Sequence, residues 1–312
     1  MIKTAMILSA GYGRRLLPLT RLRPKPMFKV LNKTMLEWWA EALLSAGIRR
    51  AVINVHHQAR QMLDHIQTLA GSFSGRLEIL ASPEEDLLGT AGGIKRAETL
   101  LGQSDFLVIN ADIFTDFELV KLAVKHLANP GRLATLGLLA GREPANVSLG
   151  QDGRIVSFRA PGPVPGETGR QLYSGVMALS PAVFGLINEG ETDIIKVFLR
   201  LLDEGKDIFG WTYDPAIWCD MGSIEDYWGL NRNLAAGRTI THSTAKIEGA
   251  LAGWNVVGAE AVIAKEARAE NCVIWPGASL ARGAMAVNAV IAGPVPSDTR
   301  VNGGFFCVLP EG

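Results

Sequence analysis

The chain has 312 residues, 48% hydrophobic and 20% charged, which suffices for one large domain and a smaller one with buried cores. Lys and Arg together number 31, as do Asp and Glu, and this zero net charge argues against a nucleic-acid or anionic-membrane protein. Three scattered cysteines and the lack of a long apolar stretch favour a cytoplasmic protein without disulfides or a membrane span.

The first half of the sequence alternates short apolar runs with amphipathic segments. The apolar runs predict strands at 5–10, 51–55, 77–81 and 106–110. Apolar residues at helical spacing predict helices at 36–44, with Gly47 as the C-cap, and at 62–69. This alternation predicts an α/β fold with a doubly wound, mostly parallel sheet, Rossmann-like in organisation. Ligands of such sheets bind at the carboxyl ends of strands, where Gly11 and Asp112 fall.

The middle of the chain adds antiparallel character. The segments 147–149 and 155–158 flank the turn Gln151-Asp152-Gly153 and predict a hairpin. A loop rich in proline and glycine follows at 160–169. This loop is either a mobile lid or an excursion without function. The lid is considered because long loops are often functional.

The sequence from about residue 250 onward repeats with an offset of 17. Asn255-Val256-Val257 matches Cys272-Val273-Ile274 and then Ala289-Val290-Ile291. Stacked aliphatic positions at such a period predict a parallel β-helix of at most three coils. The alternative is a coincidental set of strands rich in small residues. A β-helix here would cap an end or mediate oligomerisation, and Phe305-Phe306 would supply part of the cover for its last coil.

A glycine turn, Gly11-Tyr12-Gly13, directly follows the first predicted strand. Such a turn lets backbone N–H groups approach phosphate, and Arg15 and Lys25 add cations for a polyanion. The turn lacks the third glycine of a dinucleotide-binding loop and the Gly-Lys-Ser/Thr of a Walker loop. The residues therefore predict an anion site of another kind.

Five motifs in order resemble the sugar-1-phosphate nucleotidyltransferases, also called nucleotide-sugar pyrophosphorylases. The first motif is Leu8-Ser9-Ala10-Gly11-Tyr12-Gly13 with Arg15-Leu16, Pro18-Leu19-Thr20 and Pro24-Lys25-Pro26-Met27. The others are Leu88-Gly89-Thr90-Ala91-Gly92, Asn110-Ala111-Asp112, Tyr173-Ser174-Gly175-Val176 and Trp218-Cys219-Asp220-Met221-Gly222. The sequence is most similar to the mannose-1-phosphate guanylyltransferases and the N-acetylmuramate-1-phosphate uridylyltransferases.

The resemblance implies a catalytic domain at 1–236 and a short left-handed, hexapeptide-like β-helix at 237–312. It implies nucleotide contacts from Leu8, Ala10, Gly11, Gly13, Gly89 and Thr90. It implies sugar contacts from Asn110, Gly175 and Glu191. Arg15 would neutralise the triphosphate, Lys25 would bind the sugar phosphate, and Asp112 and Asp220 would hold Mg²⁺.

Three departures from the family pattern weaken single assignments. Arg14 stands where many members have Thr, Ser or Glu. Ser223-Ile224 replaces Thr-Pro, although Ser223 and Asp226 still predict a helix N-cap. The Glu-Lys pair that binds the sugar and its phosphate in many relatives aligns ambiguously around Glu191.

The predicted function is transfer of a nucleoside monophosphate from a nucleoside triphosphate to a sugar 1-phosphate, with GTP and mannose 1-phosphate preferred. Two alternatives stay open: a UTP-using uridylyltransferase for another sugar, and a catalytically silent subunit that binds nucleotide sugar. We expect a homo-oligomer formed through the C-terminal domain, and no nucleic-acid or membrane partner.

Overall fold

The computed structural model describes residues 1–309, and these form two compact units. The first unit comprises Met1–Gly11 and Trp39–Trp218. The second comprises Tyr12–Trp38 and the described residues from Cys219 onward. The chain therefore passes from one unit to the other after Gly11, Trp38 and Trp218. The expected boundary between a catalytic domain at 1–236 and a β-helix at 237–312 stays a prediction.

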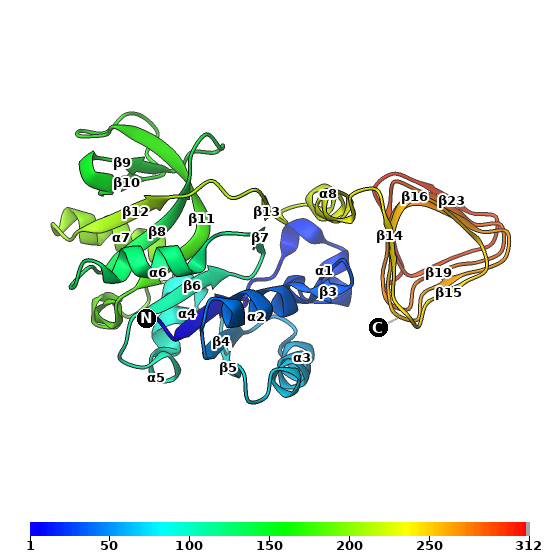
Figure 1. Cartoon of the computed structure of the whole chain (residues 1–312), viewed down its shortest axis with the longest axis horizontal. Coiled ribbons are helices and arrows are strands. Elements are labelled where there is room, and N and C mark those ends of the chain that lie inside the picture. Colours follow the sequence, from blue (N-terminus) through cyan, green and yellow to red (C-terminus); the bar gives the residue numbers. More distant parts are fainter. Residues whose placement is uncertain (310–312) are drawn as a thin grey trace. The chain divides into compact units, whose positions relative to one another are not determined.

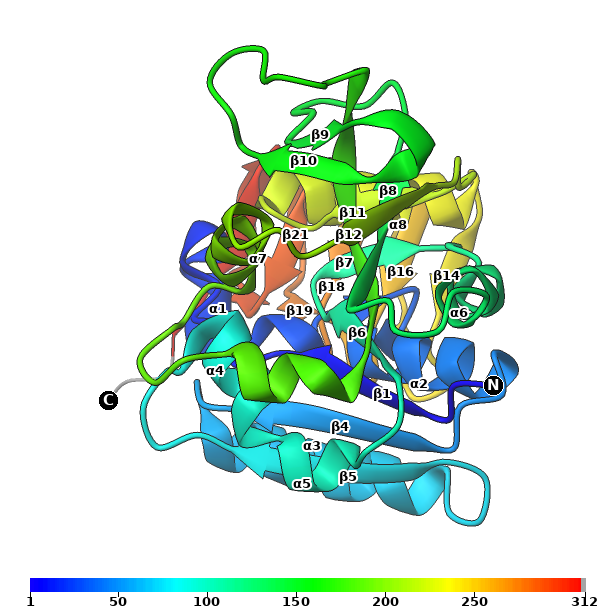
Figure 2. The ribbon, with the colours of Figure 1, turned by 90° about the vertical axis from the view of Figure 1, so that its left-hand side faces the viewer.

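The first unit is built on a large mixed sheet with the strand order β10-β9-β11-β6-β1-β4-β5, with β8 beside β11 and β12 beside β8. Its strands are β1 (Thr4–Leu8), β4 (Arg50–Val55), β5 (Glu78–Pro83), β6 (Phe106–Asn110), β8 (Ala134–Leu139), β9 (Val147–Leu149), β10 (Ile155–Phe158), β11 (Gly169–Leu179) and β12 (Ile208–Thr212), and β7 (Ile113–Thr115) follows β6. Neighbours among β5, β4, β1 and β6 run parallel, as Figure 2 shows, and β11 joins β6 antiparallel. The parallel core confirms the predicted α/β sheet.

Helices pack on this sheet because its strands are apolar on both faces. The helices of the first unit are α3 (Ala59–Ser72), α4 (Gly89–Arg96), α5 (Glu98–Leu101), α6 (Leu119–Leu127) and α7 (Ile194–Asp203), and α2 (Met35–Ser45) crosses into it from the second unit. Met6 and Val108 share one core cluster with Ile94 of α4 and Phe198 of α7. The alternate residue Ile7 is equally buried outside that cluster, as expected for a strand covered on both faces.

Two local predictions in this unit are confirmed. Gly47 follows α2 with φ +79°, and the Ile48 amide donates to the Leu43 carbonyl at 3.0 Å, as in a glycine C-cap. Strands β9 and β10 pair antiparallel around the short 3-10 turn Gln151–Gly153, as the hairpin signal predicted. A second 3-10 turn, Pro181–Leu186, follows β11.

The second unit combines a short N-terminal segment with the C-terminal part of the chain. Its N-terminal elements are the 3-10 turns η1 (Arg14–Leu16) and η2 (Lys25–Met27), α1 (Leu19–Leu22), β2 (Lys29–Val30) and β3 (Lys33–Thr34). Strand β13 (Trp218–Asp220) leads into it and α8 (Ile224–Ala235) follows. The remaining strands are β14 (Thr239–Thr241), β15 (Lys246–Ile247), β16 (Ala250–Val257), β17 (Val262–Ile263), β18 (Arg268–Ile274), β19 (Ser279–Leu280), β20 (Met285–Val287), β21 (Val290–Ala292), β22 (Pro294–Val295), β23 (Arg300–Asn302) and β24 (Phe305–Cys307).

These strands form a parallel β-helix whose coils appear nearly end-on and three-cornered in Figure 1. The pairs Val256↔Val273 and Val273↔Val290 confirm the repeat with an offset of 17. The expectation of at most three coils is wrong. Strand β14 precedes the repeat, with Ile240 paired to Val256, and β24 follows it, with Phe306 paired to Ile291. Phe305-Phe306 is thus the last strand itself and not a cover over it.

Each of the helices that the structure describes is too short or too polar to cross a bilayer.

Candidate active site

The first unit gathers its predicted site residues at the carboxyl ends of β1 and β6. Leu8 pairs with Asn110, and the Ala111 amide donates to the Leu8 carbonyl at 3.0 Å. Asp112 follows in the turn to β7, and Ala10 and Gly11 continue from β1. These two strand ends therefore present backbone groups and one carboxylate at a single sheet edge, where α/β folds bind ligands.

Gly175 approaches Asn110 closely from β11. Its φ is +85°, and a Cβ there would lie 2.7 Å from Ile113 Cγ1 and 3.4 Å from Asn110 Nδ2. A larger residue would collide with Ile113, so glycine is required at this point by both conformation and space. Asn110 and Gly175, two of the predicted sugar-contact residues, thus adjoin each other.

The second glycine motif begins helix α4 against the segment that leads to α7. Gly89 has φ +71°, and a Cβ there would lie 2.4 Å from the Thr192 carbonyl oxygen. The Thr90 hydroxyl accepts from the Ile194 amide at 2.9 Å. The Ala91 amide donates to the Thr192 carbonyl at 3.0 Å. The predicted nucleotide residues Gly89 and Thr90 are therefore fixed to the backbone next to Glu191.

Glu191 already has strong partners in this structure. Its carboxylate accepts two hydrogen bonds from Arg200 of α7, both at 2.9 Å, and one from the Asn188 amide at 2.7 Å. The Arg200 guanidinium lowers the pKa of Glu191 below its ordinary value. A sugar hydroxyl would have to share this carboxylate with Arg200, so the assignment of Glu191 to the sugar stays a prediction.

A buried polar network that the motifs did not indicate links β1 to the second glycine motif. The Ser9 amide donates to Asn54 Oδ1 at 2.7 Å, and Asn54 Nδ2 donates to Glu84 Oε1 at 2.7 Å. Glu84 Oε2 in turn accepts from the Leu88 amide at 3.0 Å. All three polar side chains are buried, so the network fixes the two predicted nucleotide-contact segments relative to each other within the first unit. A Cβ on Gly93 would fall within 3 Å of this network, which explains glycine there.

The second unit contains Tyr12 and Gly13 of the glycine turn together with the two predicted phosphate cations. Gly13 is left-handed with φ +61°, and the Thr20 hydroxyl donates to its carbonyl at 3.2 Å. A Cβ on Gly13 would lie 2.8 Å from Thr20 Cγ2. The turn therefore folds back on its own loop, which carries Arg15 and Lys25 within η1 and η2.

Asp220 lies between the two predicted phosphate cations. Arg15 Nη2 is 3.5 Å from Asp220 Oδ2, and Lys25 Nζ is 3.6 Å from Asp220 Oδ1. The Lys25 side chain is only 9% exposed, whereas that of Arg15 is 69% exposed. A Cβ on Gly222 would lie 2.4 Å from Arg15 Nη1, so glycine lets the guanidinium lie against the backbone. Two cations on one carboxylate leave a net positive cluster suited to phosphate.

The carboxylate of Asp220 also suits a divalent cation. Its Oδ1 atom is buried and accepts no hydrogen bond within the described part of the chain. This oxygen, whose ion-pair partner is the Lys25 ammonium at 3.6 Å, keeps lone pairs for a hard cation. Among the described residues no group of three or more carboxylate, histidine or cysteine side chains could hold a metal ion. A magnesium ion here would therefore need substrate phosphate oxygens and water to complete its shell, which is its usual behaviour.

Two of the departures from the family pattern have a structural account. The Arg14 guanidinium lies over the Tyr12 ring, 5.0 Å from its centroid. Ser223 forms the predicted N-cap of α8 as a full capping box, because its hydroxyl accepts from the Asp226 amide at 3.0 Å and its amide donates to the Asp226 carboxylate at 2.9 Å. The Ser-Ile pair therefore starts this helix without the usual proline.

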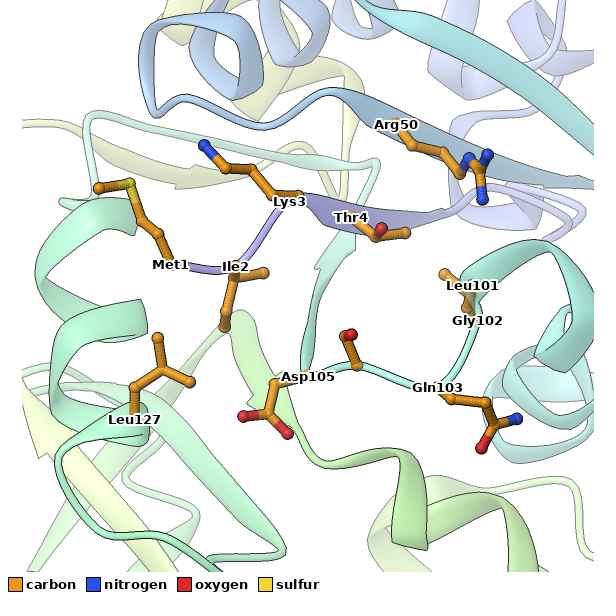
Figure 3. Close-up of a pocket in the computed structure, with 11 residues that line it drawn as sticks. Met1, Ile2, Lys3, Thr4, Arg50, Leu101, Gly102, Gln103, Asp105 and Leu127 are labelled. Carbon is orange, nitrogen blue, oxygen red and sulfur yellow. The ribbon is translucent and has the colours of Figure 1, made fainter.

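A pocket of about 560 Å³ lies at the opposite edge of the large sheet, where strands β1 and β4 begin. Figure 3 shows Lys3, Arg50 and Asp105 among its lining residues. Arg50 is already paired with Glu78 at 2.7 Å, and none of the predicted site residues lines this pocket. Its position away from the carboxyl ends argues against it as the substrate site.

Comparison with known proteins identifies the family. Residues 4–237 match the family model described as nucleotidyl transferase. The chain belongs to this family. It is 31% identical to the mannose-1-phosphate guanylyltransferase catalytic subunit beta of Drosophila pseudoobscura pseudoobscura, over 72% of this chain and 60% of that protein. It is 29% identical to the probable mannose-1-phosphate guanylyltransferase 3 of Oryza sativa subsp. japonica, over 92% of this chain and 85% of that protein.

The resemblance inferred from the five motifs is thereby confirmed at the level of the family. The chain matches about 60% of the length of the insect relatives, although it matches most of the rice protein. Two solved structures share the fold of this nucleotidyl transferase. One is a UDP-glucose pyrophosphorylase from Acinetobacter baumanii, with TM-score 0.63 and 16% identity over 75% of this chain and 94% of that one. The other is a UDP-glucose pyrophosphorylase complexed with UDP-glucose, with TM-score 0.64 and 19% identity over 76% of this chain and 100% of that one.

Proposed function

We propose that this chain transfers GMP from GTP to mannose 1-phosphate, releasing pyrophosphate and forming GDP-mannose. Relatives named as mannose-1-phosphate guanylyltransferases at about 30% identity support this choice of substrates. The observation that carries the proposal is the cluster of Arg15 and Lys25 on Asp220, because it provides cations for phosphate beside a carboxylate for a metal.

The reaction is an in-line displacement at the α-phosphorus of GTP. An oxygen of the sugar phosphate forms a bond to that phosphorus, and the bond to the β-phosphate bridging oxygen breaks. No covalent enzyme intermediate is needed, so the protein acts by positioning and by neutralising charge. Arg15 neutralises the triphosphate and the leaving pyrophosphate. Lys25 binds the phosphate of the sugar substrate as a point charge.

Asp112 of the first unit and Asp220 of the second are the proposed ligands of Mg²⁺. An ion held there would supply positive charge that stabilises the phosphate groups during transfer. The buried Oδ1 of Asp220, which accepts no hydrogen bond within residues 1–309, supports its part in this role. The Arg15 guanidinium and the Lys25 ammonium flank the same carboxylate, at 3.5 Å and 3.6 Å.

The remaining proposed contacts with the nucleotide and with mannose come mainly from residues of the first unit. Backbone groups at Leu8, Ala10 and Gly11, continued by Gly13 in the second unit, are proposed to contact the nucleotide phosphates and sugar. Gly89 and Thr90 are proposed to contact the base. Asn110, Gly175 and Glu191 are proposed to contact mannose, with Glu191 shared between the sugar and Arg200.

Two alternatives differ in the nucleotide or in catalysis. A UTP-using enzyme is the alternative suggested by the UDP-glucose pyrophosphorylases that share this fold, but identities of 16% and 19% carry the fold alone. A silent regulatory subunit would be expected to lack metal or phosphate residues. Arg15, Lys25, Asp112 and Asp220 are all present, which favours an active enzyme.

We also propose that the chain forms a homo-oligomer through its β-helix. The strand β24 pairs with β21 on one side, and Phe305 within it is 42% exposed. An exposed strand bearing a large apolar side chain is a template for association.

The decisive experiment is a screen for pyrophosphate release. Each of several nucleoside triphosphates is combined with mannose 1-phosphate, glucose 1-phosphate and N-acetylmuramate 1-phosphate in the presence of Mg²⁺. We expect the highest kcat/KM for GTP with mannose 1-phosphate. A preference for UTP would favour the uridylyltransferase alternative. No release with any pair, together with binding of GDP-mannose in calorimetry, would favour the silent subunit.

A further inference from the structure

The segment that follows Lys25 is packed against α8 and the β-helix. Phe28 is fully buried, and its ring centroid lies 4.9 Å from that of Trp275 and 5.4 Å from that of Tyr227, both with edge-to-face geometry. Trp275 lies directly after strand β18 of the β-helix, and Tyr227 lies in α8. Such aromatic clusters fix ring positions more tightly than aliphatic packing does.

Arg23, on the other side of Lys25, contacts the same tryptophan. Its guanidinium carbon lies 5.6 Å from the Trp275 ring centroid, and burial lowers the pKa of Arg23 below its ordinary value. A desolvated guanidinium over an indole ring is a strong form of this contact. The Trp275 ring therefore touches the chain on both sides of Lys25.

Hydrogen bonds from α8 and the β-helix continue the attachment beyond Phe28. The Tyr227 hydroxyl donates to the Lys29 carbonyl at 2.7 Å. Asn231 Oδ1 accepts from the Leu31 amide at 3.0 Å, and Asn32 Nδ2 donates to the Val257 carbonyl at 3.0 Å. Residues 28–32 are thus attached along their length to α8 and the β-helix.

A stiff turn connects this attachment to Lys25. Within η2 the Phe28 amide donates to the Lys25 carbonyl at 2.9 Å, and the Met27 amide donates to the Pro24 carbonyl at 2.9 Å. Pro24 and Pro26 restrict the backbone on either side of the lysine. A shift of Phe28 is therefore transmitted to Lys25.

We propose that Trp275 is a positioning residue for nucleotidyl transfer, acting through Phe28 and Arg23 to hold Lys25 at the phosphate site. The proposal rests on the proposed function for its catalytic readout. It gives the β-helix a part in substrate binding within a single chain, apart from any role in assembly. The residue lies 250 positions from Lys25 in the sequence, and no motif of the catalytic region includes it.

The test compares Trp275→Leu, Trp275→Phe and the matched control Trp254→Leu. Trp254 is as buried as Trp275, at 6% exposure, and it also packs on α8, but its ring contact is with Trp228. Trp275→Leu is expected to raise the KM for mannose 1-phosphate roughly tenfold, because Lys25 loses part of a charged phosphate contact, while the KM for GTP changes little. Trp275→Phe is expected to restore most of the loss.

Amide hydrogen exchange of the free protein supplies a readout that needs no substrate. Trp275→Leu is expected to speed exchange at the Phe28 and Met27 amides, while Trp254→Leu leaves them protected. Equal changes in the two leucine variants, or an unchanged KM for mannose 1-phosphate with native exchange, would overturn the proposal. If the wild-type chain turns over no substrate pair, the proposed function fails, and the exchange comparison still decides whether Trp275 holds the Lys25 turn.

Discussion

Lys25 is a cation that the fold buries almost completely. Burying a charge is costly unless it is paired, and here Lys25 forms an ion pair with Asp220, which Arg15 also contacts. A phosphate dianion would supply the further negative charge that this arrangement favours. The site is therefore arranged electrostatically for an anionic substrate before the substrate arrives.

Replacing Lys25 by Gln should weaken binding of the sugar phosphate more than binding of the nucleotide. A charged phosphate contact contributes about 1.5–3 kcal/mol, so the KM for mannose 1-phosphate should rise by roughly tenfold to a hundredfold. Steady-state kinetics with each substrate varied in turn measure the difference. Small and equal changes in both KM values would show that Lys25 pairs with Asp220 without binding the sugar phosphate.

The single variants Asp112→Ala and Asp220→Ala should each lower kcat by about a hundredfold or more, because each loses a proposed metal ligand. Circular dichroism and melting curves check that each variant stays folded. Asp214→Ala serves as the control, because Asp214 is an exposed carboxylate paired with Arg142 at 3.7 Å. Full activity of the wild-type chain with a chelator present would remove both aspartates as metal ligands.

Contiguous motifs point to side chains that lie together in the structure, whereas the roles of these residues stay predictions. Asp220 and Arg15 were selected from separate motifs, and the structure shows them in contact. Asn54 and Glu84 were missed because each lies at the end of an apolar strand with no motif around it. Their pairing joins segments 30 residues apart, and only the register of β4 and β5 brings them together.

At the scale of elements, the loop at 160–168 is held by its own hydrogen bonds. Glu167 Oε1 accepts from Arg170 Nε at 2.7 Å, and Glu167 Oε2 accepts from the Val164 amide at 3.1 Å. Arg170 also donates to the carbonyls of Ala160 and Gly162. The loop predicted as either a lid or an excursion is thus tied to the start of strand β11 through the ion pair between Glu167 and Arg170.

The ion pair between Glu167 and Arg170 should hold the loop in this arrangement well below neutral pH. The hydrogen bond from Arg170 lowers the pKa of Glu167 to about 2. A depressed pKa means that the stabilisation is complete above the ordinary carboxyl pKa and is lost only as the pH falls through about 2. We expect no added cleavage at 160–168 when proteolysis at pH 4 with an acid protease is compared with proteolysis at pH 7.

The same experiment on Glu167→Gln isolates the ion pair. This variant should be cleaved within the loop at both pH values, and mass spectrometry locates the cut. Glu189→Gln, at an exposed carboxylate in another loop, should behave as wild type. Cleavage of the wild-type loop at pH 4 would show that Glu167 titrates in its ordinary range.

The β-helix shows why a periodic element was predicted correctly in type and wrongly in extent. The offset of 17 holds only for the inner coils, where Val256 pairs with Val273. The first coil is shorter, since Ile240 pairs with Val256 at an offset of 16, and the last is shorter again, since Ile291 pairs with Phe306 at 15. Hydrogen bonding between coils tolerates such changes at the corners, whereas a fixed sequence offset does not.

At the scale of the whole molecule, the open end of the β-helix is the proposed site of self-association. Phe305→Glu should lower the mass in light scattering, because burying a new charge in an apolar contact is unfavourable. Val262→Glu, on strand β17 at 37% exposure, is the matched control on the side of the β-helix and should leave the mass unchanged. An unchanged mass in Phe305→Glu would place any association elsewhere.

The division of the chain into units also bears on how such proteins can be recombined in evolution. One unit takes residues Tyr12–Trp38 from near the start of the gene and the rest from its last third. A crossover that joined the β-helix of one relative to the N-terminal part of another would place Phe28 from one lineage against Trp275 from the other. We therefore expect the C-terminal repeats to be inherited together with residues 12–38, because descendants that exchanged only the C-terminal part would have to restore the contact between Phe28 and Trp275.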